Sequence, residues 1–148
     1  MKKGELLGRF LVLATNAHAG QFDKGGHPYI LHVLEVLHGV RDEDEEIQCI
    51  AVGHDLFEDT KTTVEDVIEI GATSRIIEGI LALTKQRGES YATYKKKVLS
   101  NKDAMKVKKS DLKHNSDIRR LKGVTEKDIA RMAKYMAFYT EIEAEQAK

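Results

Sequence analysis

The most informative segment of the sequence is His54-Asp55-Leu56-Phe57-Glu58-Asp59, which follows the apolar run of residues 47–52. Its four titratable side chains fall within six residues of an otherwise apolar segment whose periodicity predicts a helix. Such crowding is costly, because neighbouring carboxylates repel each other and a partly buried imidazole needs a partner. A bound metal ion would supply that partner. His-Asp dipeptides are also common on ordinary helix surfaces, so the segment alone leaves both interpretations open.

Two further polar residues lie on otherwise apolar helix faces. His32 interrupts the apolar pattern of residues 29–37, and Asp111 lies between Val107 and Leu112. We therefore predict a metal site whose ligands come from three helices: His32, His54, Asp55 and Asp111. Mixed imidazole and carboxylate ligands suit Mn²⁺, Fe²⁺, Co²⁺ or Zn²⁺, and four protein ligands in a six-coordinate shell leave positions for water and substrate.

A site of this kind favours hydrolysis of a phosphorylated substrate. A bound ion lowers the pKa of a coordinated water and offsets the charge that develops on a phosphoryl oxygen. Glu58 and Asp59 follow the His-Asp pair by one helical turn, where either carboxylate could orient or deprotonate the attacking water. We predict that these two residues are the catalytic ones.

Helical periodicity extends over nearly the whole chain and predicts an all-α fold, a bundle of about seven or eight helices. Thr63 with Asp66 and Thr125 with Asp128 have the spacing of helix-start capping pairs. The expected helices span residues 3–19, 28–40, 43–57, 63–70, 73–86, 90–100, 102–115 and 125–145. In the last of these, we expect the methionines and aromatic residues of 132–139 to lie in the core, because they recur at helical spacing.

The composition fits a single domain, residues 1–148, with a core that needs no disulfide. The hydrophobic fraction of 41% and the single proline exclude disordered and collagen-like chains. The one cysteine, Cys49, lies in an apolar run and is expected to be a buried, unreactive thiol. No apolar run approaches the ~20 residues that span a bilayer, and the run Phe10–Ala14 is too short for a signal peptide. We therefore expect a cytoplasmic protein with no membrane partner.

The zero net charge conceals a segregation along the chain. Residues 95–122 carry 11 basic and 3 acidic side chains, whereas residues 1–94 carry 9 basic and 16 acidic ones. A basic segment of this kind could attract a polyphosphate or a nucleic acid, or it could be a solvated helix surface offset by the acidic run of residues 42–46. No aromatic residues alternate with the later lysines, as a platform for single strands would require. We expect a small nucleotide polyphosphate as the partner, and not a nucleic acid.

The order of the motifs resembles that of one known family. The motifs are Ala17-His18-Ala19-Gly20-Gln21, Lys24, Pro28-Tyr29-Ile30-Leu31-His32, His54-Asp55-Leu56-Phe57-Glu58-Asp59-Thr60 and Ser110-Asp111-Leu112-Lys113-His114-Asn115. Over residues 5–120 the chain resembles the HD-superfamily hydrolase domain of the RelA/SpoT alarmone enzymes. The resemblance is greatest to the stand-alone small alarmone hydrolases, which include the metazoan SpoT homologues. It implies an all-helical HD domain. We expect no synthetase half, because only about 30 residues follow the segment that carries the resemblance.

The resemblance also implies an activity and a set of site residues. The family hydrolyses guanosine tetra- and pentaphosphate, (p)ppGpp, to GDP or GTP and pyrophosphate, and depends on Mn²⁺. Its ligands for one ion per chain match His32, His54, Asp55 and Asp111. Its acidic pair matches Glu58 and Asp59, and its substrate-binding residues match Lys24, in the first loop, and Asn115, one turn after the last ligand.

One departure from the family bears on the substrate. The family usually has Arg-Lys in the first loop, with the arginine packed on the guanine base, whereas this chain has Asp23-Lys24. A carboxylate cannot stack on a purine as a guanidinium plane does. We therefore expect metal-dependent phosphohydrolysis to be retained. Recognition of guanine would need another residue, such as Arg9, Arg41 or a lysine of the basic segment.

Alternatives to the alarmone hydrolase remain. Asp23 motivates a second hypothesis, an HD phosphohydrolase that acts on another nucleotide or on a nicotinamide cofactor phosphate. A third hypothesis is a sensor that binds a nucleotide without turnover, but the presence of both Glu58 and Asp59 argues against it, because a sensor needs no water-activating carboxylates. The sequence leaves the oligomeric state open, a homo-oligomer included.

Overall fold

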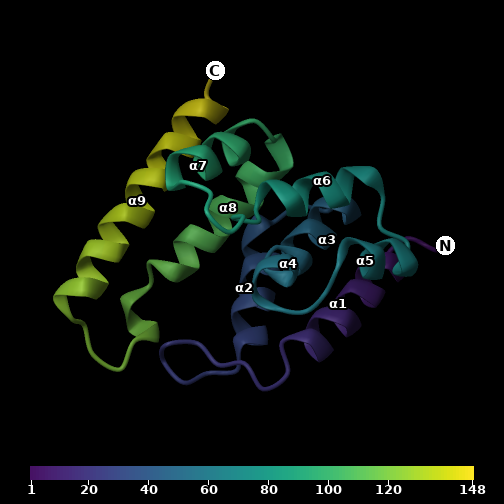
Figure 1. The fold of residues 1–148 in the computed structure, drawn as a ribbon, viewed down its shortest axis with the longest axis horizontal. Coiled ribbons are helices and arrows are strands. Elements are labelled where there is room, and N and C mark those ends of the chain that lie inside the picture. The colour runs from purple at the N-terminus through teal and green to yellow at the C-terminus, as the bar shows by residue number, and fades with distance from the viewer.

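The structure, a computed structural model, describes residues 1–148 and is built from helices (Figure 1). The prediction of an all-α fold is confirmed. In chain order the helices are α1 (Glu5–Ala17), α2 (Tyr29–Val40), α3 (Glu45–Gly53), α4 (Leu56–Asp59), α5 (Val64–Ile70), α6 (Ser74–Ala82), α7 (Tyr91–Leu99), α8 (Lys102–Asn115) and α9 (Glu126–Gln146), with a 3₁₀ turn (Ile118–Arg120) before α9. The β-type pairing is limited to an isolated bridge between Phe22 and Pro28.

The starts of most helices are fixed by side chains that cap them. Thr63 and Thr125 form the two expected capping boxes, in which each threonine hydroxyl accepts a hydrogen bond from the backbone N–H of Asp66 or Asp128. The first N–H groups of a helix have no partner within it, so such caps define where it begins. Single side-chain caps begin α3, α6, α7 and α8 at Asp44, Thr73, Ser90 and Asn101.

The helix expected over residues 43–57 is interrupted at His54 and Asp55. Helix α3 ends at Gly53, Asp55 has φ −110° and ψ 3°, and the four-residue α4 follows at Leu56. Adjacent residues on a regular helix point in different directions, so an unbroken helix could not aim both side chains at one centre. The interruption removes that constraint, and His54 Nε2 lies 2.9 Å from Asp55 Oδ2.

Helix α3 forms the centre of the core. Six of its nine residues are buried, and α1, α2, α6 and α8 pack around it. Helix α6 approaches closely, since a Cβ on Gly79 would lie 2.5 Å from Ile50 Cδ1. Burial raises the pKa of the Cys49 thiol to about 12, which agrees with the expected buried, unreactive cysteine.

Helix α9 covers one side of the molecule, and α1 and α5 lie on the opposite side (Figure 1). Phe138 of α9 is buried, as expected, against α7. Tyr135 and Tyr139 are half-buried and pack against the core, but Met132, which lines a cavity, and Met136, which is exposed, do not lie in the core as expected. The reason for the position of Met132 is that this part of α9 borders the cavity, with Arg131 and Tyr135 beside it. None of the helices combines the length and the apolarity needed to cross a bilayer.

The loop between α1 and α2 meets the connection between α8 and α9. Gly25 of the loop is buried, and a Cβ on it would lie 2.0 Å from the carbonyl oxygen of Arg120. Only a glycine permits so close an approach. The contact brings the loop, the end of α8 and the start of α9 around one cavity.

Candidate metal centre and adjoining cavity

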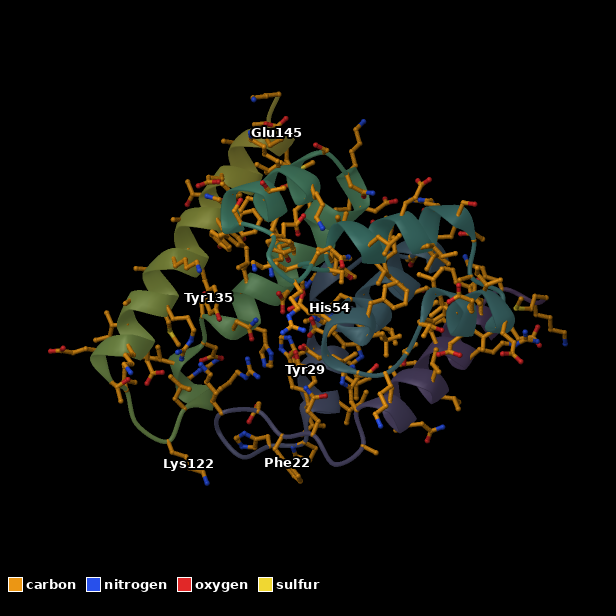
Figure 2. All side chains as sticks on the ribbon, viewed as in Figure 1. Phe22, Tyr29, His54, Lys122, Tyr135 and Glu145 are labelled. Atoms are coloured by element: carbon orange, nitrogen blue, oxygen red, sulfur yellow. The ribbon has the colours of Figure 1, made fainter.

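The four side chains predicted to bind a metal ion meet near the centre of the molecule, where Figure 2 shows His54 close to Tyr29. Ligand atoms of His32, His54 and Asp55 all lie within 4.8 Å of one another. Asp111 Oδ1 lies 2.9 Å from His32 Nε2 and 3.5 Å from His54 Nε2. Helix α2, the break after α3 and helix α8 thus contribute to one cluster, and three of its residues are almost fully buried.

Both imidazoles are held by the ring nitrogen that faces away from the cluster. His54 Nδ1 lies 2.7 Å from the carbonyl oxygen of Ala51, which can only accept, so Nδ1 carries the proton. His32 Nδ1 lies 2.7 Å from His114 Nδ1, with the two rings stacked. Metal-binding histidines are commonly oriented in this way, with the far nitrogen bonded and the near one directed at the ion.

His54 Nε2 is the atom that most requires a cation. It is buried without a hydrogen-bond partner, and the carboxylates of Asp55 and Asp111 face it. Burial alone would lower the pKa of His54, but the two carboxylates outweigh burial and hold the pKa well above its ordinary value. The negative charge of the two carboxylates can be balanced in two ways. Either His54 is protonated, or a divalent ion binds to Nε2. The donor set therefore fits a metal ion.

The two carboxylates of the cluster are supported by neighbouring side chains. Asp111 Oδ2 accepts from Lys108 Nζ at 2.9 Å, and Oδ1 accepts from Asn115 Nδ2 at 3.0 Å. Burial would raise the pKa of Asp111, but Lys108 and the imidazoles hold it well below its ordinary value. Tyr29 donates its hydroxyl hydrogen to Asp55 Oδ2. Both carboxylates are thus kept ionised, the form in which carboxylates bind metals.

The two predicted catalytic carboxylates follow on α4. Glu58 Oε1 accepts from the backbone N–H of Lys85 at 2.6 Å. Burial, together with the charges of Asp55 and Glu58, raises the pKa of Asp59 to about 6. A carboxylate with a pKa near neutrality is a better proton acceptor than an ordinary aspartate.

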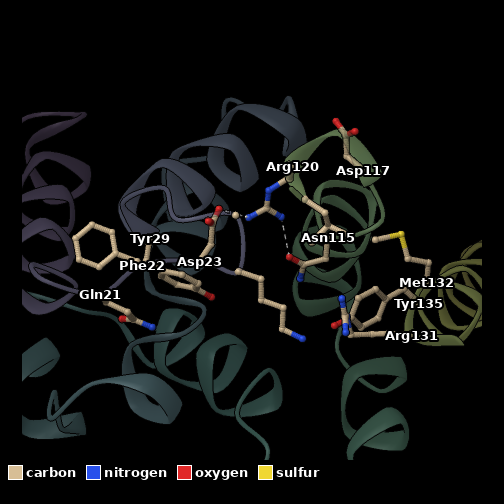
Figure 3. Close-up of a pocket in the computed structure, with 13 residues that line it drawn as sticks. Gln21, Phe22, Asp23, Tyr29, Asn115, Asp117, Arg120, Arg131, Met132 and Tyr135 are labelled. Carbon is tan, nitrogen blue, oxygen red and sulfur yellow. Dashed lines mark hydrogen bonds and ion pairs between the residues drawn. The ribbon is translucent and has the colours of Figure 1, made fainter. Parts of the chain in front are cut away.

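A cavity of about 290 Å³ lies beside the cluster (Figure 3). Lys24 and Asn115, the two predicted substrate-binding residues, both line it. Asn115 joins the cavity to the metal centre, because its amide nitrogen donates to Asp111 while its oxygen accepts from Arg120. Tyr29 also joins the cavity to the metal centre, because it lines the cavity and its hydroxyl donates a hydrogen bond to Asp55.

Sequence reasoning missed several residues of the cavity wall. Arg120 lies in it, and Figure 3 shows the guanidinium between Asp23 and Asn115. Arg131 and Tyr135 of α9 also line the cavity. No local motif marks these positions, because the fold brings them to Asp23 from about a hundred residues along the chain.

The residues expected to compensate for Asp23 lie elsewhere. Arg9 bonds to the carbonyl oxygen of Ile70, and Arg41 follows the end of α2, so neither lines the cavity. Lysines of the basic segment do not line it either. Many of these lysines form ion pairs with carboxylates of other elements: Lys95 with Glu141, Lys97 with Glu89, Lys106 with Asp42 and Lys109 with Glu143.

Comparison with known proteins gives relatives with two names, GTP pyrophosphokinase and guanosine-3′,5′-bis(diphosphate) 3′-pyrophosphohydrolase, although no family model matches the chain. The GTP pyrophosphokinase of Myxococcus xanthus is 28% identical over a match that covers 87% of this chain and 19% of that protein. The guanosine-3′,5′-bis(diphosphate) 3′-pyrophosphohydrolase of Aquifex aeolicus is 31% identical over 70% of this chain and 16% of that protein. An enzyme of the same name from Haemophilus influenzae is 37% identical over 50% of this chain and 12% of that protein. The chain therefore spans less than one fifth of the length of these relatives.

Among solved structures, the chain is similar to a metazoan ortholog of SpoT that hydrolyses ppGpp. The TM-score is 0.76, with 20% identity, and the match covers 96% of this chain and 87% of that one. This likeness establishes the fold. Together with the sequence relatives, it confirms the predicted resemblance to hydrolases of the SpoT/RelA type.

Proposed function

We propose, from the premise that this chain is a homologue of the SpoT/RelA hydrolases with an HD-type helical fold, that it hydrolyses guanosine-3′,5′-bis(diphosphate) to GDP and pyrophosphate, and the pentaphosphate to GTP and pyrophosphate. One observation carries the proposal. A buried, unpartnered imidazole nitrogen of His54 faces two carboxylates, at a cluster that opens beside a cavity. That arrangement fits a divalent cation and leaves space for a substrate beside it.

The chemistry divides between the ion and the side chains. A bound divalent ion would lower the pKa of a coordinated water and would offset negative charge on the phosphoryl oxygens. Asp59 accepts the proton of the attacking water, whose oxygen bonds to phosphorus while the bond from phosphorus to the ribose 3′ oxygen breaks. The proton then passes to the 3′ oxygen, and pyrophosphate leaves. Glu58, with Oε1 held by Lys85, keeps Oε2 free to orient the water.

The two substrate-binding residues have separate tasks in this proposal. Lys24 lines the cavity and takes part in none of the ion pairs, whereas its neighbour Asp23 pairs with Arg120, so we assign Lys24 to the phosphates of the substrate. Asn115 holds the wall between the ion and the cavity, because it bonds to Asp111 on one side and to Arg120 on the other.

We further propose Mn²⁺ as the ion, one per chain, with Fe²⁺, Co²⁺ and Zn²⁺ as alternatives that the same ligands would accept. Residues 1–148 would form one hydrolase domain that works in the cytoplasm on a small nucleotide. Activity with each ion in turn, added to metal-free protein, tests the choice of metal.

The test of the proposed function is the release of pyrophosphate and phosphate from guanosine tetraphosphate, with and without Mn²⁺. Wild type is compared with Asp55→Ala, which removes a predicted ligand, and with Glu69→Ala, which removes an exposed carboxylate of α5. We expect pyrophosphate from metal-loaded wild type and Glu69→Ala, and none from Asp55→Ala. Equal turnover by Asp55→Ala would refute the proposed site.

Asp23 favours a second candidate function, hydrolysis of another phosphorylated nucleotide or of a nicotinamide cofactor phosphate. The reason is that its carboxylate occupies the place at which the family usually has an arginine. A panel of nucleotides under the same conditions separates the two. Guanosine tetraphosphate as the poorest substrate of the panel would support the second candidate.

A further inference from the structure

We propose that Arg120, held in place by Asp23, recognises the planar base of the nucleotide. The proposal rests on the proposed function for the identity of the nucleotide, but not for the geometry of the contact. It assigns a specificity role to Arg120 and a positioning role to Asp23.

The Asp23–Arg120 pair lies where the loop between α1 and α2 contacts the connection between α8 and α9. Arg120 Nη2 donates to Asp23 Oδ2 at 3.1 Å, and the side chains are only 19% and 11% exposed. Asp23 is itself fixed, because its Oδ1 accepts from the backbone N–H of His27 at 2.9 Å. The close approach of Gly25 to the carbonyl oxygen of Arg120 holds the two loops together.

The guanidinium of Arg120 is held at three of its five N–H groups. Nη1 donates to the carbonyl oxygen of His114 and to Asn115 Oδ1, both at 3.1 Å, and Nη2 donates to Asp23. The remaining N–H of Nη2 and that of Nε have no protein partner. A planar group fixed on one edge, with free donors on the other, can stack on a flat ligand or bond to its acceptors without further ordering.

The charges of the cavity wall favour a base over a phosphate at Arg120. The two arginines that line the cavity each have a carboxylate partner, Arg120 with Asp23 and Arg131 with Asp128. A neutralised guanidinium attracts a phosphate weakly but keeps its flat face. Lys24 keeps its unpaired charge and is the better phosphate ligand in the wall.

The size and lining of the cavity agree with a base. At about 290 Å³ it lies at the lower end of small-molecule pockets, so it holds part of a nucleotide rather than the whole. Phe22, Tyr29 and Tyr135 line it with the arginine. Aromatic rings and guanidinium planes are the groups on which bases stack in proteins.

The experiment measures substrate kinetics and ligand binding separately. Arg120→Lys keeps the charge and removes the plane, and Asp23→Asn removes the charge that holds the arginine. Arg119→Lys is the matched control, because its side chain is 88% exposed and bonds only to Asp117. For each protein we would measure kcat and KM with guanosine tetraphosphate, and the binding of GDP and of inorganic pyrophosphate after EDTA treatment. Thermal unfolding checks that each variant is folded.

We expect KM to rise about tenfold in Arg120→Lys, with kcat nearly unchanged, and to rise less in Asp23→Asn. GDP binding should weaken in parallel, while pyrophosphate binding and the Arg119→Lys control stay at the wild-type level. Equal loss of GDP and pyrophosphate binding would make Arg120 a phosphate ligand and overturn the proposal. So would unchanged KM and GDP binding in folded Arg120→Lys.

The binding measurements also separate this proposal from the proposed function. If wild type does not hydrolyse guanosine tetraphosphate but Arg120→Lys still weakens GDP binding, the base site stands and the substrate assignment fails. If wild type hydrolyses guanosine tetraphosphate and Arg120→Lys leaves KM and GDP binding unchanged, the proposed function stands and the base site fails. If wild type binds no GDP, the base site is wrong.

The double variant Asp23→Arg/Arg120→Asp exchanges the two charges of the pair. We expect its KM to be lower than that of either single variant, because one paired guanidinium then faces the cavity again.

Discussion

Gly25 lies at a close contact between the two loops that border the cavity. A Cβ at this position would lie 2.0 Å from the carbonyl oxygen of Arg120, a backbone atom that cannot rotate away. We therefore expect Gly25→Ala to separate the two loops and lower the free energy of unfolding by about 1–3 kcal/mol. We also expect KM to rise, because the Asp23–Arg120 pair spans the same junction. Urea denaturation and steady-state kinetics measure the two effects.

Gly8→Ala is the matched control for this prediction. Gly8 lies in α1, and a Cβ on it would have no heavy atom within 4 Å. Alanine is favoured over glycine in a helix, so this variant should be as stable as wild type or more stable by up to about 1 kcal/mol. Equal stability of the two alanine variants would contradict the close contact at Gly25.

The residues of the metal centre and those of the cavity differ in how far the sequence predicts them. His32 and Asp111 stand out as polar residues on apolar faces, so periodicity alone can find them. Arg120 cannot be found in this way. It contacts Asp23, which is 97 positions away, and its neighbour Arg119 has the same side chain but points into solvent.

Helix α9 depends on a capping box whose strength varies with pH. Hydrogen bonds from Thr125 and Arg131 lower the pKa of the Asp128 carboxyl to about 2, below its ordinary value of 3.8. The ionised carboxylate therefore stabilises the folded state above pH 4, and this contribution is lost as the pH falls toward 2. We expect Asp128→Asn to be less stable than wild type at pH 7, with the difference shrinking between pH 4 and pH 2.

Urea unfolding of both proteins at a series of pH values measures this difference. Glu126→Gln, which changes an exposed acid of the same helical turn outside the capping box, is the control. A difference between wild type and Asp128→Asn that stays constant down to pH 2 would show that the carboxylate charge is not what stabilises the cap.

Helices are the part of the fold that the sequence predicts best. The expected ranges 63–70 and 102–115 lie within one residue of α5 and α8, because capping residues mark their first turns. The interruption at His54 and Asp55 is not predictable from local preference. It depends on partners from α2 and α8, which only the assembled bundle supplies.

For the whole molecule, the metal centre should act as a cross-link. Its predicted ligands come from α2, the α3–α4 junction and α8, and His32 and Asp111 are 79 positions apart. The unfolded chain does not hold these ligands together, so an ion stabilises only the folded state. At an ion concentration of 100 times Kd the gain in stability should be about 2.7 kcal/mol.

Thermal unfolding after EDTA treatment, followed by addition of Mn²⁺, measures this gain. We expect Tm to fall with EDTA, to recover with Mn²⁺ in wild type and in His38→Ala, and not to respond in His54→Ala. His38 is an exposed histidine of α2 and serves as the matched control. A Tm of His54→Ala that responds to Mn²⁺ as wild type does would place the ion elsewhere.

Asn115 connects the candidate metal centre with the proposed base site. Its amide touches Asp111 on one side and Arg120 on the other, so each site is built partly from the same side chain. Thermodynamic reciprocity then requires that whatever affinity the ion lends to the nucleotide, the nucleotide lends to the ion. If the proposed function holds, molecules that have bound nucleotide would lose their ion last when metal is scarce, and the concentration of nucleotide would set how much of the protein stays metal-loaded.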